Sequence, residues 1–108
     1  MIVAISISPS GTDETGGVSQ AVADAVEVIR ESGLPNETNA MFTNIEGEWD
    51  EVMAVVKAAV FRVAETSPRV GLVLKADIRR GFETGQLTAK VERVEEHLGS
   101  AGDRAGDR

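Results

Sequence analysis

The sequence predicts an α+β fold in which amphipathic strands alternate with helices. Apolar residues alternate with small or polar residues at the start of the chain and again at residues 70–80, which is the period of a half-buried strand. Between these stretches, apolar residues recur every three to four positions over two long segments, which is the period of an amphipathic helix. With 108 residues, of which 42% are hydrophobic, the chain has the length and apolar content of one domain with its own core.

The first strand is predicted for residues 2–8, where valine and isoleucine alternate with alanine and serine. The segment 9–12 is expected to end this strand, because proline has no backbone N–H and glycine permits a turn. The apolar residues of segment 18–29 then fall on one side of a helix, and Gly33 and Pro35 mark its end.

Residues 37–46 are predicted as two short extended pieces, interrupted near Asn39. Gly47 breaks the second piece, and the apolar stripe of a second helix follows over residues 49–63. Trp49, at the beginning of this stripe, is expected to be buried as a core anchor.

The longest predicted strand covers residues 70–80, and a third helix with a narrow apolar stripe follows at residues 87–98. A stripe this narrow indicates a helix that packs on a single surface, and Gly99 fits its C-cap. Residues 1–98 are therefore predicted to form the domain. Residues 99–108 are predicted to be a flexible tail, because the repeated Ala-Gly-Asp-Arg has no hydrophobic side chain larger than that of alanine.

The predicted order of elements, β-α-β-β-α-β-α, is that of a ferredoxin-like antiparallel sheet with an added C-terminal helix. Both crossover helices are expected on one face of the sheet, each connection being right-handed. The opposite, open face is then polar and mixed, and it requires solvent, a partner subunit or a ligand. Its predicted residues are Ser6, Ser8, Phe42, Asn44, Glu46, Val73, Lys75 and Asp77.

The composition narrows the function classes. The formal net charge of −7, from 11 basic and 18 acidic residues, argues against binding to a nucleic-acid backbone and is compatible with a cationic ligand, although its main expected role is solubility. The chain has no cysteine and a single histidine, so neither a disulfide framework nor a metal site is expected. Its start shows no signal-peptide pattern, and no apolar run reaches the length of a membrane span, so we expect a cytoplasmic protein without a membrane partner.

Three local motifs are similar to those of a known family. Residues 9–12, Pro-Ser-Gly-Thr, resemble its Pro-x-Gly-Thr; residues 43–47, Thr-Asn-Ile-Glu-Gly, resemble its Thr-x-Ile-Glu-Gly; and residues 75–80 resemble its Lys-x-Asp-x-Arg-Arg. The motifs have the same order and spacing, and the likeness runs from Met1 to about Leu98, including the last predicted helix. The chain thus resembles the small thiamine-binding protein family related to YkoF.

This resemblance implies a ferredoxin-like fold, assembly into homodimers or tetramers, and non-enzymatic binding of thiamine or its hydroxymethylpyrimidine moiety at the sheet or subunit interface. It implies no cofactor, thiamine itself being the ligand, and no catalytic or metal-binding residue. The chain departs from the family at Phe42, where family members often have glycine. The ring of Phe42 either stacks on a ligand or fills the pocket.

Thiamine joins a cationic thiazolium to a flat aminopyrimidine, so its site needs a flat apolar surface, hydrogen-bond partners and negative charge. Phe42 can supply a cation–π face, and the Glu46 carboxylate can accept from the amino group or balance the cation. The full set of candidate ligand-binding residues is Ser8, Thr12, Phe42, Thr43, Asn44, Glu46 and Asp77.

Each of these candidates also has a structural interpretation. Glu46 can pair with Lys75, and Asp77 can pair with a neighbouring arginine. Phe42 can pack in a subunit interface, and Thr43 can face the core. Two other functions remain open: a regulatory or assembly module without a small ligand, and an acylphosphatase-like hydrolase. The hydrolase is less favoured, because residues 9–17 hold no arginine or lysine for a phosphate.

Overall fold

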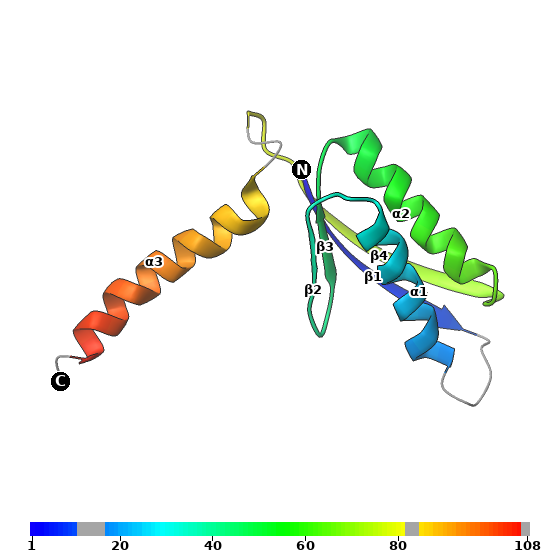
Figure 1. The fold of residues 1–108 in the computed structure, drawn as a ribbon, viewed down its shortest axis with the longest axis horizontal. Coiled ribbons are helices and arrows are strands. Elements are labelled where there is room, and N and C mark those ends of the chain that lie inside the picture. Colours follow the sequence, from blue (N-terminus) through cyan, green and yellow to red (C-terminus); the bar gives the residue numbers. More distant parts are fainter. Residues whose placement is uncertain (11–16, 82–84, 107–108) are drawn as a thin grey trace.

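The computed structural model describes residues 1–10, 17–81 and 85–106. Within them the order of elements is β1 (Ile2–Ser10), α1 (Gly17–Glu31), β2 (Asn36–Thr38), β3 (Thr43–Glu46), α2 (Trp49–Ala64), β4 (Arg69–Asp77) and α3 (Gln86–Gly106). This is the predicted α+β, ferredoxin-like arrangement with an additional C-terminal helix (Figure 1).

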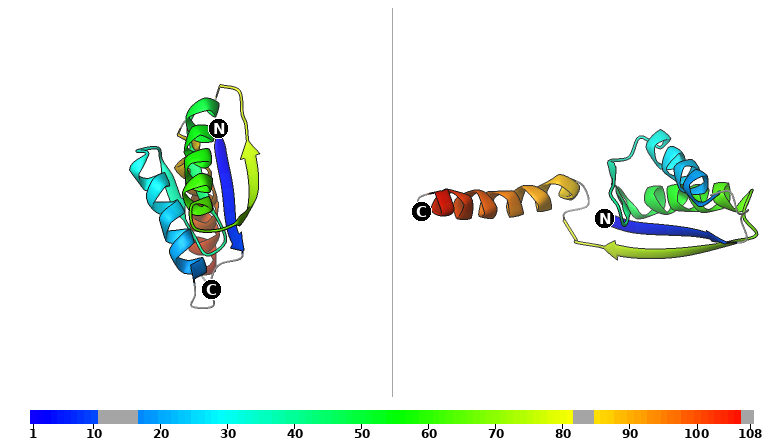
Figure 2. Two further views of the ribbon diagram at one scale, coloured as in Figure 1. Left: turned by 90° about the vertical axis from the view of Figure 1, so that its right-hand side faces the viewer. Right: turned by 90° about the horizontal axis from the view of Figure 1, so that it is seen from below.

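The strands form one antiparallel sheet in the order β2-β3-β1-β4. Helices α1 and α2 lie on the same face of this sheet, as Figure 2 shows from two sides. The other face is the open face, and α3 begins beside it and then extends away from the body (Figure 1). The predicted placement of both crossover helices on one face is therefore confirmed.

The core lies between the sheet and the two crossover helices, where the alternating residues of the strands meet the helical stripes. Val3, Ile45, Val52 and Val63 are completely shielded from solvent, and Ile29 of α1 is 1% exposed. Because burial of such side chains is the main source of folding stability, this single layer stabilises the domain.

Strand β1 ends at Ser10, within the segment 9–12 that was expected to end it, but it continues through Pro9, two residues beyond the predicted end at Ser8. The register explains why. Strand β3 pairs with β1 only as far as Ile5, whereas β4 pairs with it up to Ser10. Beyond Ile5 one edge of β1 has no described neighbour, and a proline without an N–H is tolerated at such an edge.

Trp49 is 54% exposed, so its predicted role as a core anchor is wrong. It is the first residue of α2, and the buried stripe of that helix begins only at Val52 and continues through Val56, Ala59 and Val63. A period of three to four residues identifies a helix face, but it does not reveal at which residue the burial of that face begins.

Helix α3 runs on to Gly106, so the predicted C-cap at Gly99 is wrong. Beyond its first two turns, its apolar stripe does not pack on the body: Val94 and Leu98 are 56% and 58% exposed. The division into a domain and a flexible tail stays a prediction. No helix in the described part of the chain has the length and hydropathy needed to cross a membrane.

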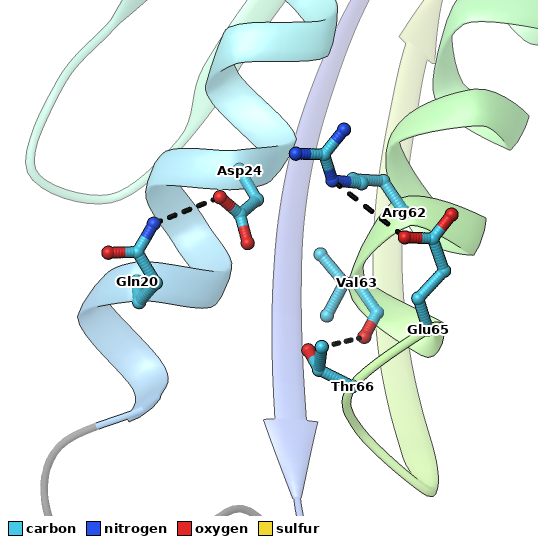
Figure 3. A network of polar contacts seen from close by, with 6 residues as sticks. All are labelled: Gln20, Asp24, Arg62, Val63, Glu65 and Thr66. Carbon is cyan, nitrogen blue, oxygen red and sulfur yellow. Dashed lines mark hydrogen bonds and ion pairs between the residues drawn. The ribbon is translucent and has the colours of Figure 1, made fainter.

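The polar contacts drawn on α1 and at the end of α2 are short-range (Figure 3). Gln20 Nε2 donates to Asp24 Oδ1 at 3.0 Å, Arg62 and Glu65 form an ion pair at 4.0 Å, and the Thr66 hydroxyl donates to the Val63 carbonyl at 3.4 Å. Contacts of this kind on exposed surfaces contribute little to stability.

Ser67 gives a first testable prediction. It is 3% exposed, and its hydroxyl has no hydrogen-bond partner among the described residues. Ser67→Ala removes an unsatisfied polar atom, so we expect the free energy of unfolding in urea to rise by about 1 kcal/mol. Ser32→Ala is the control and is expected to lower that energy, because the Ser32 hydroxyl donates to the Ile29 carbonyl. A destabilised Ser67→Ala variant would contradict the prediction.

Candidate ligand site on the open sheet face

A cavity of about 300 Å³ lies on the open face, between the sheet and the first turns of α3. Strands β1 to β4 each contribute to its floor, and α3 forms one wall. Its lining residues are Ile2, Ala4, Glu37, Asn44, Lys75, Asp77, Leu87 and Val91.

The strand register aligns four of these residues in a single row across the sheet. Glu37 of β2 pairs with Asn44 of β3, Asn44 pairs with Ala4 of β1, and Ala4 pairs with Lys75 of β4. Directly paired residues on antiparallel strands point to the same face, so three polar side chains flank one alanine. The small side chain of Ala4 leaves the space that its larger neighbours surround.

A second row lies two residues further along each strand, on the same face of the sheet. It places Glu46, Ile2 and Asp77 side by side. Asp77 extends the polar rim of the cavity, and Ile2 extends its apolar floor. The register thus brings together two residues predicted from the sequence for ligand binding, Asn44 and Asp77.

The lining combines apolar surface with a few polar groups. Ile2, Ala4, Leu87 and Val91 supply the apolar surface, whereas Glu37, Asp77 and Lys75 give the lining a formal excess of negative charge. Asn44 Nδ2 donates to Glu37 Oε1 at 3.1 Å, which fixes the amide and turns its oxygen into an oriented acceptor. Such a cavity suits a flat ligand that carries hydrogen-bond donors and a positive charge.

Glu46 lies behind this cavity rather than in its lining. It is 2% exposed, and both carboxylate oxygens accept from the start of α3: Oε2 from the Gln86 N–H at 2.7 Å, and Oε1 from the Leu87 N–H at 3.3 Å. The alternative ion pair with Lys75 does not form within the described residues.

Phe42 and Thr43 lie elsewhere. Thr43 is 8% exposed and shares a hydrogen bond of 3.1 Å with the Thr38 hydroxyl, so its predicted alternative, facing the core, is confirmed. Phe42 precedes β3, and its N–H donates to Asn39 Oδ1 in the hairpin connection. Phe42 and Thr43 line a separate hollow of about 220 Å³. Asn44 and Glu46 lie on the open face as expected, because they pair with Ala4 and Ile2 of β1. Phe42 precedes β3 and is not part of the cavity lining.

Ser8 and Thr12 complete the predicted set. Ser8 pairs with Gly71, whereas the cavity lies at the Ile2 end of β1. At the rise of a strand, Ser8 is about 13 Å from Ala4 and about 20 Å from Ile2. Thr12 lies outside the described residues. The structure thus collects only part of the predicted set into one place.

The lining residues missing from the predicted set are those whose place depends on how the strands pair or on where α3 packs against the sheet. Glu37 and Lys75 belong to the site because of the register of β2 and β4. Leu87 and Val91 belong to it because the first turn of α3 is hydrogen-bonded to Glu46 at the end of β3. Lys75 was predicted on the open face. The signal available for Glu37 is a carboxylate at the start of the extended segment 37–46, but only the hairpin register places it opposite Asn44.

The fold and the cavity define a ferredoxin-like α+β protein with a small, mixed-charge hollow on the open face of its sheet. The chain belongs to the thiamine-binding protein family, whose model it matches over residues 3–95. This confirms the resemblance found in the sequence motifs.

Individual relatives agree. The chain is 52% identical over 99 residues to the UPF0045 protein Mb1933 of Mycobacterium bovis, covering 91% of this chain and 94% of that one. The solved structure of the hypothetical protein MJ1052 from Methanocaldococcus jannaschii superposes with a TM-score of 0.72 at 35% identity, covering 91% and 94% of the two chains. TM0486 of Thermotoga maritima, whose name assigns it provisionally to thiamine biosynthesis or salvage, gives a TM-score of 0.71 at 26% identity, covering 84% and 96%.

Proposed function

We propose that this protein binds thiamine or its hydroxymethylpyrimidine moiety without catalysing a reaction, and that the ligand occupies the cavity between the open sheet face and α3. The family is named for thiamine binding, which supports the class of ligand. The observation that carries the choice of site is the cross-strand row of Glu37, Asn44, Ala4 and Lys75 beside Asp77.

The ligand chemistry fits this lining. The flat pyrimidine can lie on Ile2 and Ala4, while its amino group donates to the oriented oxygen of Asn44. The thiazolium cation is then balanced by a carboxylate, for which Asp77 is the candidate. Of the residues predicted from the sequence, we propose Asn44 and Asp77 for direct contact.

Calorimetry with thiamine, and separately with hydroxymethylpyrimidine, tests the proposal. We expect binding heat and a thermal shift with at least one of them. No heat and no shift at millimolar ligand would overturn the proposed function and leave the assembly module as the better hypothesis.

Asn44→Ala is expected to weaken the affinity about tenfold, because a good hydrogen bond to a buried ligand group is worth about 1.4 kcal/mol. Gln20→Ala is the control, since Gln20 is an exposed amide on α1, and α1 lies on the face of the sheet opposite to the cavity. Equal affinities for both variants would remove Asn44 from the site.

We also propose that the chain associates with itself. The apolar stripe of α3 is exposed, and Val73 on the open face of the edge strand β4 is 63% exposed. An edge strand and an apolar helix face of this kind favour pairing with a second copy. Leu98→Glu is expected to lower the mass measured by light scattering. Phe61→Glu, on a residue of α2 that is 61% exposed, is expected to leave it unchanged. A monomeric wild-type chain would contradict the proposal.

A further inference from the structure

Glu46 has an unusual position for a carboxylate. It is the last residue of β3, its side chain is 2% exposed, and Ile2 is its neighbour on β1. A buried carboxylate is costly unless it is well hydrogen-bonded, so its partners indicate why this position tolerates it.

Its partners are the first backbone N–H groups of α3. Such groups have no acceptor within their own helix and carry the positive end of the helix dipole. Glu46 receives both the Gln86 and the Leu87 N–H, one on each carboxylate oxygen. The helix is therefore capped by a side chain about 40 residues earlier in the chain, and not by a neighbouring residue.

This cap also fixes one wall of the cavity. Leu87 donates to Glu46 through its backbone and lines the cavity through its side chain, and Val91 follows one turn later. Beyond these turns α3 extends away from the body (Figure 1). The element that it contacts most is β3. The two hydrogen bonds to Glu46 link the first turn of α3, and with it the wall, to the sheet.

We propose that Glu46 is a positioning residue: it does not contact the ligand but holds the first turn of α3 against the sheet, so that Leu87 and Val91 close the cavity. The effect of Glu46 on the affinity for thiamine rests on the proposed function. Its structural part, the orientation of α3, is independent of any ligand.

The orientation of α3 is measurable by spin labelling, because the chain contains no native cysteine. Labels at Lys57→Cys on α2 and Glu95→Cys on α3, both exposed positions, report the distance between the two helices. Labelled protein is diluted with an excess of unlabelled protein, so that distances between copies do not contribute. We expect a single narrow distribution for the parent chain and a broad one for Glu46→Ala.

Glu48→Ala is the matched control. Glu48 lies two residues further on, is exposed, and makes no side-chain capping bond to α2, so its loss should leave the distribution narrow. Glu46→Gln keeps the shape of the side chain but offers only one acceptor oxygen to two N–H groups, so we expect a width between those of the parent and Glu46→Ala.

Affinity gives the second readout. If the wall is loosened, thiamine binding to Glu46→Ala should weaken by at least about tenfold, the loss expected for a charge-assisted hydrogen bond. If the parent binds no thiamine, the proposed function fails, yet the spin-label result still tests Glu46. A narrow, unshifted distribution in a folded Glu46→Ala protein overturns the positioning role. If Glu46→Ala does not fold, Glu46→Gln provides the test: a distance distribution broader than that of the parent supports the positioning role, and an unchanged one contradicts it.

Discussion

Replacing Ile45 by alanine is expected to lower the free energy of unfolding by about 3 to 4 kcal/mol, the loss typical of truncating a fully buried isoleucine. Ile45 is 0% exposed and pairs with Val3 at the centre of the sheet. Since domains of this size are stable by only about 5–15 kcal/mol, the variant should unfold at a much lower urea concentration.

The control for Ile45→Ala is Val73→Ala, which truncates an exposed side chain in β4. It is expected to change the unfolding energy by less than about 0.5 kcal/mol in the isolated chain. A loss below about 1 kcal/mol for Ile45→Ala would mean that the core relaxes around the missing atoms. Such a result would contradict a tightly packed layer between the sheet and α2.

Asp77→Asn is expected to produce the largest loss of thiamine affinity, about 2 kcal/mol or roughly thirtyfold, because it removes the carboxylate proposed to balance the cation. The affinity for hydroxymethylpyrimidine, which lacks the thiazolium, is expected to fall much less. Calorimetry on both ligands therefore tests which end of thiamine lies beside Asp77.

Asp50→Asn is the matched control, since it changes the net charge by the same amount at an exposed position in the first turn of α2. If both variants weaken binding equally, the effect is one of overall charge and Asp77 has no local role. Raising the salt concentration should reduce the loss for Asp50→Asn more than for Asp77→Asn, because screening acts mainly between exposed and distant charges.

The topology was predictable because each element carries its own period. The alternation in β1 and β4 and the helical spacing in α1 and α2 each depend on neighbouring residues, and together they leave few possible connections. The errors concern places where tertiary neighbours decide. Pro9 is tolerated because β3 does not reach that end of β1, and Trp49 is exposed because α2 begins beyond its buried stripe.

The site was predictable only in part, for the same reason. Asn44 and Asp77 could be assigned to the open face from alternation within their own strands. The position of Phe42 depended on the hairpin that Asn39 caps, and the role of Glu46 depended on where a later helix begins. Neither is encoded in the local sequence, because both follow from contacts between segments that are separate in the chain.

The wall made by Leu87 and Val91 has a consequence for synthesis. The described strands β1 to β4 are complete once Asp77 has been made, whereas the wall belongs to α3, which follows them. During translation, domains generally begin to fold from their N-terminal part. The sheet residues of the cavity are therefore synthesised before Leu87 and Val91, so a nascent chain on the ribosome holds the floor of the cavity before it holds the wall.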